Sequence, residues 1–317
     1  KNLVSRTMKG DRMAFRMTIV GLGLVGSSLG LALKGTGADL EIIGHDKDGD
    51  AARRAYKSGC VDRTEWNLIN ACEGADLIII STPLAGIKST LAAIAQDVKA
   101  GCVITDTASL KVPVFDWARE SLPSNVHFVG GHPIINKRDS EAMAPTADLF
   151  TGSVYCLTPS VSTPPEALQR VSDLAEAVGA RPYYLDAAEH DGLIAAVEQL
   201  PLLIALALQT TAGQSPARRE MIQLSGADFT SATRLLAGDA EGLAELCMLN
   251  AVNLARGLDT ILPQLSALRD LVANGDNVAL QKSFARALEI HAEWAPKGDE
   301  SEPTNYNDFS MGRMMFG

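Results

Sequence analysis

The sequence predicts an α/β fold in which a parallel-sheet domain is followed by an all-helical domain. Over the first 186 residues, short β-rich runs alternate with helix-patterned stretches, which is typical of a parallel sheet covered on both faces. After Asp186 the β-rich runs almost vanish, and long segments with helical apolar periodicity follow. We expect domains over residues 14–187 and 188–292, with flexible ends at 1–13 and 293–317.

The expected sheet contains strands that are buried on both faces. Two runs, "DLIIIST" and "CVITDT", are continuously apolar, as such strands should be. Each run ends in polar residues at the carboxyl end of its strand, which is where parallel sheets bind ligands. The strands are expected at residues 14–20, 41–46, 76–81, 101–106, 127–130, 153–158 and 181–186.

The segment "MTIVGLGLVGSSLGLAL" predicts a phosphate-binding turn between the first strand and the first helix. Gly21 permits the tight turn, Gly23 keeps side chains away from a phosphate, and Gly26 lets the helix pack closely on the sheet. The amide groups of Leu24 and Val25 then face a pyrophosphate at the positive end of the helix dipole. The first domain is therefore a candidate Rossmann-type dinucleotide-binding domain, with a glycine-rich turn that holds no ligand as the alternative.

The second expected strand ends in Asp46, 20 residues past the last of these glycines. A carboxylate there can accept hydrogen bonds from both ribose hydroxyls of a dinucleotide and repels a 2′-phosphate, so NAD is favoured over NADP. NADP stays open because three basic residues nearby could compensate a phosphate in part: Lys47, Arg53 and Arg54. We also assign to the cofactor the residues at the end of the third strand, Ser81, Thr82 and Pro83.

Two polar clusters follow the fourth and fifth strands. In "TDTASLK", the side chains of Asp106, Ser109 and Lys111 are expected to point into the cofactor cleft, although Asp106 or Ser109 could instead cap the next helix. We count Asp106 among the cofactor-binding residues. In "VGGHPI", His132 follows two glycines, and an imidazole beside a nicotinamide can take a proton while hydride leaves. A structural role for His132 is the alternative.

The helical region contains one unusually apolar segment, "LIAAVEQLPLLIALAL", at residues 193–208. We expect it to be buried on every side, within its domain or between subunits, and we expect a homodimer to be built there. Pro201 predicts a kink near Val197 or Glu198. Glu198 and Gln199 are the only polar side chains of the segment, so they need partners or a substrate unless they face a solvated cleft.

Helices are expected near residues 188–211, 215–237, 240–273 and 276–291. Within the second of these, Arg234 lies in the Ala- and Leu-rich segment "GADFTSATRLL". A guanidinium in such surroundings requires a carboxylate, which either the substrate or the protein could supply.

The composition narrows the class of protein. The chain has 317 residues, 46% of them hydrophobic and 21% charged, which suits a globular protein with two full-sized cores. The net charge of −10 argues against a nucleic-acid partner, and five widely spaced cysteines suggest neither a disulfide framework nor a metal site. No window approaches the roughly 18 uninterrupted apolar residues of a membrane helix. The basic start lacks the apolar core of a secretory signal, so we expect a cytoplasmic protein with a small-molecule substrate and no membrane partner.

Over residues 14–292 the sequence resembles the prephenate and arogenate dehydrogenase family. The resemblance rests on the order of these motifs along the chain: "GLGLVGSS", Asp46, "TDTASLK", which matches the family's D-x-x-S-x-K, "GGHP", "DLFTGSVYCLTP", "EHDGLIAAVEQLP" and "FTSATRLL". The resemblance implies a dinucleotide-binding domain followed by a helical dimerisation domain. It also implies oxidation of a cyclohexadienol with loss of carbon dioxide, which yields an aromatic ring on the route to tyrosine.

The same resemblance implies roles for three residues. His132 would accept the proton of the ring hydroxyl while hydride passes to NAD⁺, Ser109 would hydrogen-bond to that hydroxyl and to His132, and Arg234 would hold a substrate carboxylate. The chemistry agrees, because hydride loss leaves a carbonyl conjugated with the ring diene, and the departing carboxylate then finds an electron sink without a metal. The protein need only position the ring, receive one proton and balance the anionic charge.

The sequence departs from the family pattern in the substrate half. The usual S-H-L-P-H reads "EQLPL" at residues 198–202, so Gln199 replaces the histidine that meets the substrate's side chain. The usual glycine after H-P-x-x is Asn136, and two basic residues follow it. We place Glu198, Gln199 and Asn136 in the substrate pocket, where Glu198 could pair with the ammonium of arogenate rather than with the keto group of prephenate.

Three other interpretations stay open. A β-hydroxyacid dehydrogenase or imine reductase on the same scaffold would be expected to carry a lysine between residues 188 and 211, and the sequence has none there. A relative acting on 4-amino-4-deoxyprephenate would need only a modified proton acceptor. A non-enzymatic NAD-binding sensor would keep the glycines and Asp46 but would not need Ser109, His132 and Arg234 together.

Overall fold

The computed structural model describes residues 15–135 and 144–294. These residues form two compact units. The first unit comprises 15–135, 144–192 and 239–249, and the second comprises 193–238 and 250–294. The predicted flexible ends lie outside the described residues, apart from Glu293 and Trp294. The predicted domain limits of 14–187 and 188–292 remain a prediction.

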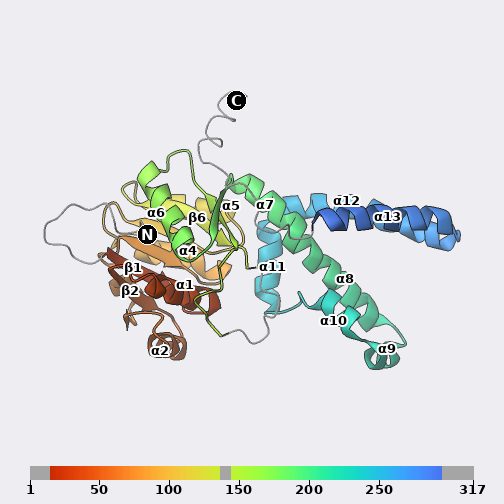
Figure 1. Cartoon of the computed structure of the whole chain (residues 1–317), viewed down its shortest axis with the longest axis horizontal. Coiled ribbons are helices and arrows are strands. Elements are labelled where there is room, and N and C mark those ends of the chain that lie inside the picture. Colours follow the sequence, from red (N-terminus) through yellow and green to blue (C-terminus); the bar gives the residue numbers. More distant parts are fainter. Residues whose placement is uncertain (1–14, 136–143, 295–317) are drawn as a thin grey trace. The chain divides into compact units, whose positions relative to one another are not determined.

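An eight-stranded sheet in the order β3-β2-β1-β4-β5-β6-β7-β8 forms the centre of the first unit (Figure 1). All neighbouring strands are parallel except β6 and β7, which are antiparallel. The strands are β1 (Phe15–Val20), β2 (Leu40–His45), β3 (Arg63–Thr64), β4 (Leu77–Ile80), β5 (Val103–Asp106), β6 (His127–Pro133), β7 (Val154–Thr158) and β8 (Arg181–Tyr184).

The sequence predicted a parallel sheet, and one pair of its strands, β6 and β7, is instead antiparallel. A parallel neighbour requires a crossover, usually a helix, whereas residues 134–135 and 144–153, the described part of the connection from β6 to β7, contain no helix. The chain can therefore return beside β6 in the opposite direction, with His132 opposite Cys156. Strand β3 was not predicted, because two residues are too few to show a periodic pattern.

Helices cover both faces of the sheet, and each face has its own hydrophobic core. Side chains alternate along a strand, so Leu77 and Ile79 of β4 pack into one core while Ile78 and Ile80 pack into the other. Helices α1 and α6 contribute to the first core, and α3, α4 and α5 contribute to the second. The helices of this unit are α1 (Leu24–Gly35), α2 (Gly49–Lys57), α3 (Leu68–Cys72), α4 (Leu84–Ile94), α5 (Val112–Ser121), α6 (Pro165–Ala177), most of α7 (Ala187–Ile194), and α11 (Ala240–Leu249).

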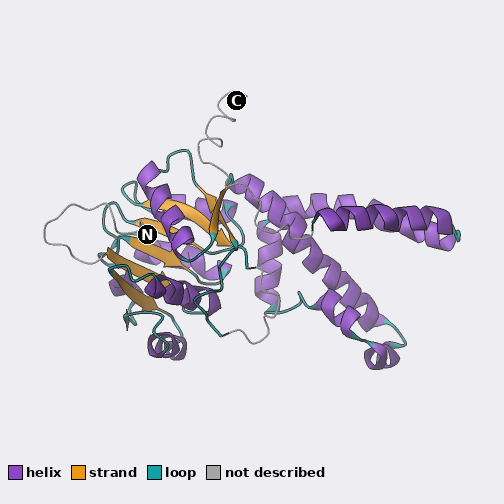
Figure 2. Cartoon of the chain, viewed as in Figure 1, coloured by secondary structure: helices purple, strands orange, loops and turns teal. Residues whose placement is uncertain are grey.

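The described residues of the second unit contain helices and no strands (Figure 2). Helix α12 packs against α13, and α8 packs against α10. The elements are the π-helical turn η1 (Ala195–Gln199), α8 (Leu200–Gln214), α9 (Arg218–Leu224), α10 (Ala227–Thr233), α12 (Ala251–Ala273) and α13 (Asn277–Glu293). The predicted fold class, an α/β sheet domain followed by a helical domain, is thus confirmed.

Two of the long helices expected after Asp186 were wrong as single helices. The segment 215–237 is divided into α9 and α10, because Gly226 adopts an extended conformation and caps the second helix. The segment 240–273 is divided at Asn250, whose φ of −124° and ψ of 26° are not helical. Both divisions fall at residue types that favour helix ends.

The kink expected near Val197 or Glu198 takes the form of the π-helical turn η1. Pro201 has no amide N–H, so it cannot donate to a carbonyl one turn earlier in the helix. The amide of Leu200 bonds to the carbonyl of Ala195, five residues back, which widens the turn just before the proline.

Residues 193–208 are not buried on every side within the single chain, so burial within the domain was wrong, and burial between subunits stays a prediction. Leu193, Val197 and Leu206 are each about half exposed, at 49%, 51% and 49%. The continuous helical run Ala187–Gln214 is long and apolar enough to cross a membrane by length and composition, a test that a core helix of a globular protein also passes.

Candidate active site

The glycine turn between β1 and α1 is formed at positions where larger residues would not fit. Gly21 has a φ of +95°, and a Cβ there would lie 2.4 Å from the carbonyl oxygen of Ser81. A Cβ on Gly26 would lie 2.0 Å from the carbonyl oxygen of Gly21, so helix and turn touch directly. Gly23 differs, because a Cβ there would meet no atom within 4 Å. The protein's own packing therefore does not require a glycine at position 23, and the space beside its Cα is open to a ligand.

The start of α1 has the features of an anion site. Gly23 is its N-cap and provides no side-chain hydrogen bond, and the first turn contains no acidic residue. The amides of Leu24 and Val25 lie in this first turn, where helix N–H groups have no partner within the helix. The turn therefore fits the pyrophosphate of a dinucleotide.

Asp46 follows β2 and is tied to the glycine turn. One carboxylate oxygen accepts a hydrogen bond from the amide of Leu22 at 2.7 Å, and the other accepts one from the amide of Asp48 at 2.8 Å. Each carboxylate oxygen can accept a second hydrogen bond. The position therefore suits a ribose whose two hydroxyls donate to Asp46.

The residues after β4 lie directly beside this turn. A Cβ on Gly21 would come within 3.0 Å of the amide nitrogen of Thr82. The hydroxyl of Thr82 is buried and has no hydrogen-bond partner among the described residues, and the hydroxyl of Ser81 accepts a hydrogen bond from Thr107 at 3.2 Å. Pro83 is the N-cap of α4. An unpartnered buried hydroxyl beside the glycine turn is a further feature that a bound cofactor would satisfy.

Asp106 and Lys111 form a buried ion pair with no exposed surface. The Lys111 ammonium also donates to the carbonyl of Gly131 at 2.6 Å, and Asp106 accepts hydrogen bonds from the amides of Gly131 and Ala108 at 3.1 and 3.0 Å. Burial lowers the pKa of Lys111, and the carboxylate of Asp106 opposes that shift. The pair joins the end of β5 to β6, so Asp106 supports the site from within the protein; its predicted contact with the cofactor stays a prediction.

The two glycines before His132 are required by neighbouring protein atoms. A Cβ on Gly130 would lie 2.2 Å from the Thr158 hydroxyl oxygen, and a Cβ on Gly131 would lie 2.6 Å from the Asp106 carbonyl oxygen. The two glycines therefore allow β6 to lie close to β7 and β5.

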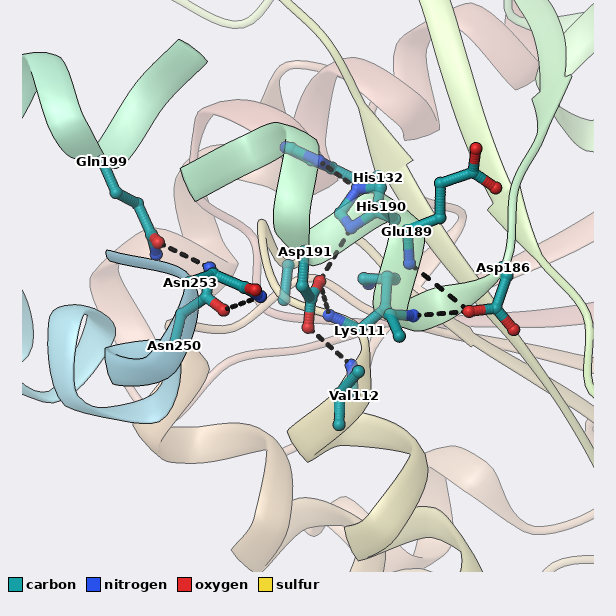
Figure 3. Close-up of polar contacts among 12 residues, drawn as sticks. Lys111, Val112, His132, Asp186, Glu189, His190, Asp191, Gln199, Asn250 and Asn253 are labelled. Carbon is teal, nitrogen blue, oxygen red and sulfur yellow. Dashed lines mark hydrogen bonds and ion pairs between the residues drawn. The ribbon is translucent and has the colours of Figure 1, made fainter. Parts of the chain in front are cut away.

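His132 lies at the carboxyl end of β6 and is 6% exposed. Its Nδ1 lies 3.0 Å from Nε2 of His190, and Nδ1 of His190 lies 2.8 Å from a carboxylate oxygen of Asp191 (Figure 3). Burial, the charge of Lys111 and the proximity of His190 hold the pKa of His132 well below its usual value. The imidazole of His132 is thus neutral at neutral pH and can accept a proton.

Helix α7 supplies His190 and Asp191, and its start is fixed by Asp186. The Asp186 carboxylate accepts hydrogen bonds from the amides of Ala188 and Glu189 at 2.9 and 3.3 Å, which caps the helix. Asp191 in turn accepts hydrogen bonds from the amides of Lys111 and Val112 at 2.7 and 2.8 Å. The cap of α5 is therefore Asp191, and the alternative that Asp106 or Ser109 caps that helix was wrong.

The other predicted site residues are placed as follows. Ser109 is partly exposed, and within the described residues it makes no hydrogen bond to His132, whose ring contacts His190 instead. Glu198 belongs to the π-helical turn η1 and has an exposed surface, but the protein around its carboxyl group partly removes that group from water and so raises its pKa. Arg234 is exposed at the C-terminal end of α10 and has no ion pair with a described residue. Asn136 lies outside the described residues.

Gln199 is buried and takes part in a chain of amides within the second unit. Its side-chain oxygen accepts a hydrogen bond from Asn250 at 2.7 Å, and Asn250 accepts one from Asn253 at 2.8 Å (Figure 3). This chain links η1 to the start of α12, so Gln199 has a partner in the protein, as a buried amide requires.

Sequence reasoning missed the roles of His190 and Asp191. Both are in the segment "EHDGL", which carried part of the family resemblance, but no spacing rule links them to His132, 58 residues away from His190. Only the folding of α7 onto the ends of β5 and β6 brings these groups together. All five cysteines lie within the described residues as thiols outside disulfides, and the described residues contain no cluster of potential metal ligands.

The chain matches two family descriptions over most of its length. Residues 29–184 match "Prephenate dehydrogenase, nucleotide-binding domain", and residues 186–286 match "Prephenate dehydrogenase, dimerization domain". A cyclohexadienyl dehydrogenase of Zymomonas mobilis is 29% identical over 270 residues, covering 84% of this chain and 92% of the relative. A probable prephenate dehydrogenase of Streptomyces niveus is 32% identical over 282 residues, covering 86% of this chain and 73% of the relative.

Solved structures show the same fold. A prephenate dehydrogenase from A. aeolicus, in complex with hydroxyphenyl propionate and NAD⁺, superimposes with a TM-score of 0.81 at 23% identity, covering 90% of this chain and 99% of that one. Together with the two matched domains and the similarity to the Streptomyces niveus protein, this fold leads to one conclusion: the chain belongs to the prephenate dehydrogenase family.

Proposed function

We propose that this protein catalyses the NAD-dependent oxidative decarboxylation of prephenate, of arogenate, or of both. The observation that carries the proposal is the neutral, buried His132 at the carboxyl end of β6, in a sheet whose glycine turn fits a dinucleotide. An enzyme that removes a hydride from a carbon bearing a hydroxyl needs one group to accept the hydroxyl proton, and a neutral imidazole can do so.

NAD⁺, when bound, supplies the hydride acceptor. The residues proposed to hold it are those of the glycine turn, with the amides of Leu24 and Val25 at the pyrophosphate and Asp46 at the ribose. Ser81, Thr82, Pro83 and Asp106 are proposed to line the rest of the cofactor site. Asp46 favours NAD, because a 2′-phosphate would be repelled by its carboxylate.

The protein's own residues handle the proton and the anionic charge. His132 accepts the proton of the ring hydroxyl at its Nε2, the ring nitrogen that does not face His190. Loss of the hydride and of that proton leaves a ring carbonyl. As carbon dioxide leaves, the electron pair of its bond to the ring moves through the diene onto the carbonyl oxygen, which becomes a phenolate and is protonated to the phenol. Ser109 is proposed to orient the hydroxyl, and Arg234 to bind a substrate carboxylate.

Glu198, Gln199 and Asn136 are proposed to shape the end of the pocket that meets the substrate's side chain. A carboxylate at Glu198 would favour the ammonium of arogenate over the keto group of prephenate, because opposite charges attract and a carboxylate cannot donate a hydrogen bond to a ketone. We therefore propose arogenate as the preferred substrate.

We further propose that the protein is a cytoplasmic homodimer joined through its helical region. The match of residues 186–286 to a dimerization domain supports a dimer, and the half-exposed leucines of α8 provide apolar surface for it. Burial against a second copy would also account for the apolar run Ala187–Gln214 without a membrane.

The test is a direct assay of the purified protein with NAD⁺ and either prephenate or arogenate, in which the absorbance of NADH is followed over time. We expect NADH to form with at least one substrate. The rate of NADH formation should fall by about 10²- to 10⁴-fold in His132→Asn, which retains a polar side chain but cannot act as the base. If no NADH forms with either substrate, in protein that still binds NADH, the proposed reaction is wrong.

A further inference from the structure

His132 does not stand alone, because it is the end of a hydrogen-bonded chain of three buried side chains. The chain runs from His132 through His190 to Asp191, with distances of 3.0 and 2.8 Å between the bonded atoms (Figure 3). His190 and Asp191 are 1% and 2% exposed. Water therefore has little access to either partner, and the protein itself must fix where their protons lie.

The donors and acceptors of this chain can be assigned in order from Asp191. An ionised carboxylate only accepts hydrogen bonds, and both oxygens of Asp191 already receive backbone amides, from Lys111 and Val112. The Nδ1 of His190 must therefore donate to Asp191. A neutral His190 then has an unprotonated Nε2, which accepts from Nδ1–H of His132. This order leaves Nε2 of His132 as the unprotonated nitrogen, the one needed to receive a proton.

The charges around the two rings differ. Beside His132 lie the Lys111 ammonium, paired with Asp106, and the thiol of Cys156 opposite it on β7. The carboxylate of Asp191 instead contacts His190 directly. A positive charge is therefore stabilised better on His190, next to a carboxylate, than on His132, next to a lysine.

One residue fixes the spacing of the chain at both ends. The backbone amide of Lys111 holds the Asp191 carboxylate, while its ammonium holds the carbonyl of Gly131, directly before His132. Because Lys111 is fully buried and ion-paired, neither end of the chain can shift without breaking these contacts.

We propose that His190, held by Asp191, is a positioning residue that keeps the unprotonated Nε2 of His132 facing the substrate and takes over the proton that His132 receives. When the substrate hydroxyl gives its proton to Nε2 of His132, the proton on Nδ1 of His132 moves to Nε2 of His190. The result is a neutral His132 protonated on Nε2 and a His190 imidazolium paired with the Asp191 carboxylate. No proton is gained or lost overall. The transfer step rests on the proposed function, whereas the resting position of the protons does not.

The first test reads the protons directly and needs no substrate. The ¹⁵N shifts of the imidazoles in the full chain, labelled at its five histidines, distinguish protonated from unprotonated ring nitrogens. The signals of His132 and His190 are assigned with His132→Asn and His190→Gln. We expect His132 to be protonated on Nδ1 and bare on Nε2. A His132 protonated on Nε2 in the resting protein would overturn the proposal, even if the enzyme turned over its substrate.

The second test separates holding the ring from accepting the proton. In His190→Gln an amide oxygen can occupy the place of Nε2 and accept from His132, but it cannot take up a proton. In His190→Asn the shorter amide can reach Asp191 but not His132. We expect kcat to fall about 10-fold or more in His190→Gln and about 100-fold or more in His190→Asn, with KM and NADH binding changed less than about twofold.

The matched control is His127→Gln, which changes a histidine at the opposite end of the same strand, β6. We expect its kcat to equal that of the unchanged protein. A His190→Gln variant with unchanged kcat and an unchanged pH profile would show that His190 takes no proton. Absence of turnover in the unchanged protein would instead contradict the proposed function, and the ¹⁵N measurement would still decide the resting state.

Discussion

At the scale of single residues, His132 shows how a buried imidazole is kept ready to accept a proton. Its surroundings disfavour a positive charge, since burial removes water and Lys111 lies nearby. The pKa of His132 is therefore well below the usual value for histidine, about 6.5. The group is therefore neutral at neutral pH, so it need not lose a proton before each turnover.

The low pKa of His132 predicts an unusually acid-tolerant enzyme. The acidic limb of kcat/KM reports the pKa of the base in the free enzyme, so we expect activity to stay level as pH falls through about 6.5 and to decline only at lower pH. The measurement is a pH profile of kcat/KM, and a half-maximal value at or above pH 6.5 that persists in His190→Gln would contradict the assignment of His132.

The same pKa shift makes the folded protein less stable at acidic pH. Because the pKa of His132 is lowered in the folded state, the unfolded chain binds this proton first as pH falls. The contribution of His132 to the free energy of unfolding is thus complete above about pH 6.5 and is lost progressively as the pH falls below that value. Urea unfolding at several pH values, compared with His132→Asn, isolates this contribution.

Glu198 is the residue that we expect to decide between the two substrates. Replacement by glutamine removes the charge with little change in volume, so Glu198→Gln should lower kcat/KM for arogenate by about tenfold, or about 1.4 kcal/mol, and leave that for prephenate unchanged or higher. Glu220→Gln, on the exposed surface of α9, is the control. An unchanged ratio of kcat/KM for the two substrates would contradict the proposal that Glu198 contacts the substrate.

At the scale of the elements, most of the sheet could be predicted because its strands are apolar runs that end in polar residues. The runs around Ile78 and Ile104 gave the positions of β4 and β5 within one or two residues. The direction of β7 could not be predicted, because a short apolar strand looks the same whichever way it runs. The division of α9 from α10 at Gly226 was also missed, since an apolar period continues across it.

The parts of the candidate site that could be predicted are those in which a short sequence motif itself contains the functional residues. The glycine turn and His132 follow from motifs whose spacing is set by the strand and helix that hold them. The partnership of His132 with His190 depends on tertiary packing, and the exposed position of Arg234 depends on where α10 ends. Periodicity carries no information on either point.

The glycine turn yields a prediction at Gly23. A Cβ at this position meets no protein atom within 4 Å, so Gly23→Ala should fold normally, yet its methyl group would occupy the space proposed for the pyrophosphate. We expect the Kd for NADH to rise more than tenfold, measured by fluorescence titration. Gly35→Ala, at the other end of α1 and equally unobstructed, should leave the Kd unchanged. Equal affinities in the two variants would place the pyrophosphate elsewhere.

At the scale of the whole molecule, the described helices of the second unit expose many large apolar side chains. Large apolar side chains of α8, α12 and α13 are exposed, among them Leu206, Leu265 and Leu288 at 49%, 48% and 66%. Scattered apolar residues are normal on a protein surface, but several on one set of helices indicate a covered face. The dimerization domain that matches this region supports a second copy of the chain as the cover.

The homodimer can be tested by placing a charge on that surface. We expect the unchanged protein to have the mass of a dimer in size-exclusion chromatography with light scattering, and Leu206→Glu to shift it toward the monomer. Val161→Glu, on a fully exposed loop position of the sheet unit, should not change the mass. A monomeric unchanged protein at micromolar concentration would contradict the proposal.

The complete burial of Lys111 makes this side chain a natural reporter of how often the nucleotide-binding fold opens. A reagent that acylates amines can reach Lys88, whose side chain is 61% exposed, at any time, but it can reach Lys111 only while the strands around it are parted. The ratio of the two labelling rates, read by mass spectrometry, would therefore measure the free energy of that opening in the intact protein. Bound NADH should slow the labelling of Lys111 and leave that of Lys88 unchanged, since the ligand stabilises the closed form alone.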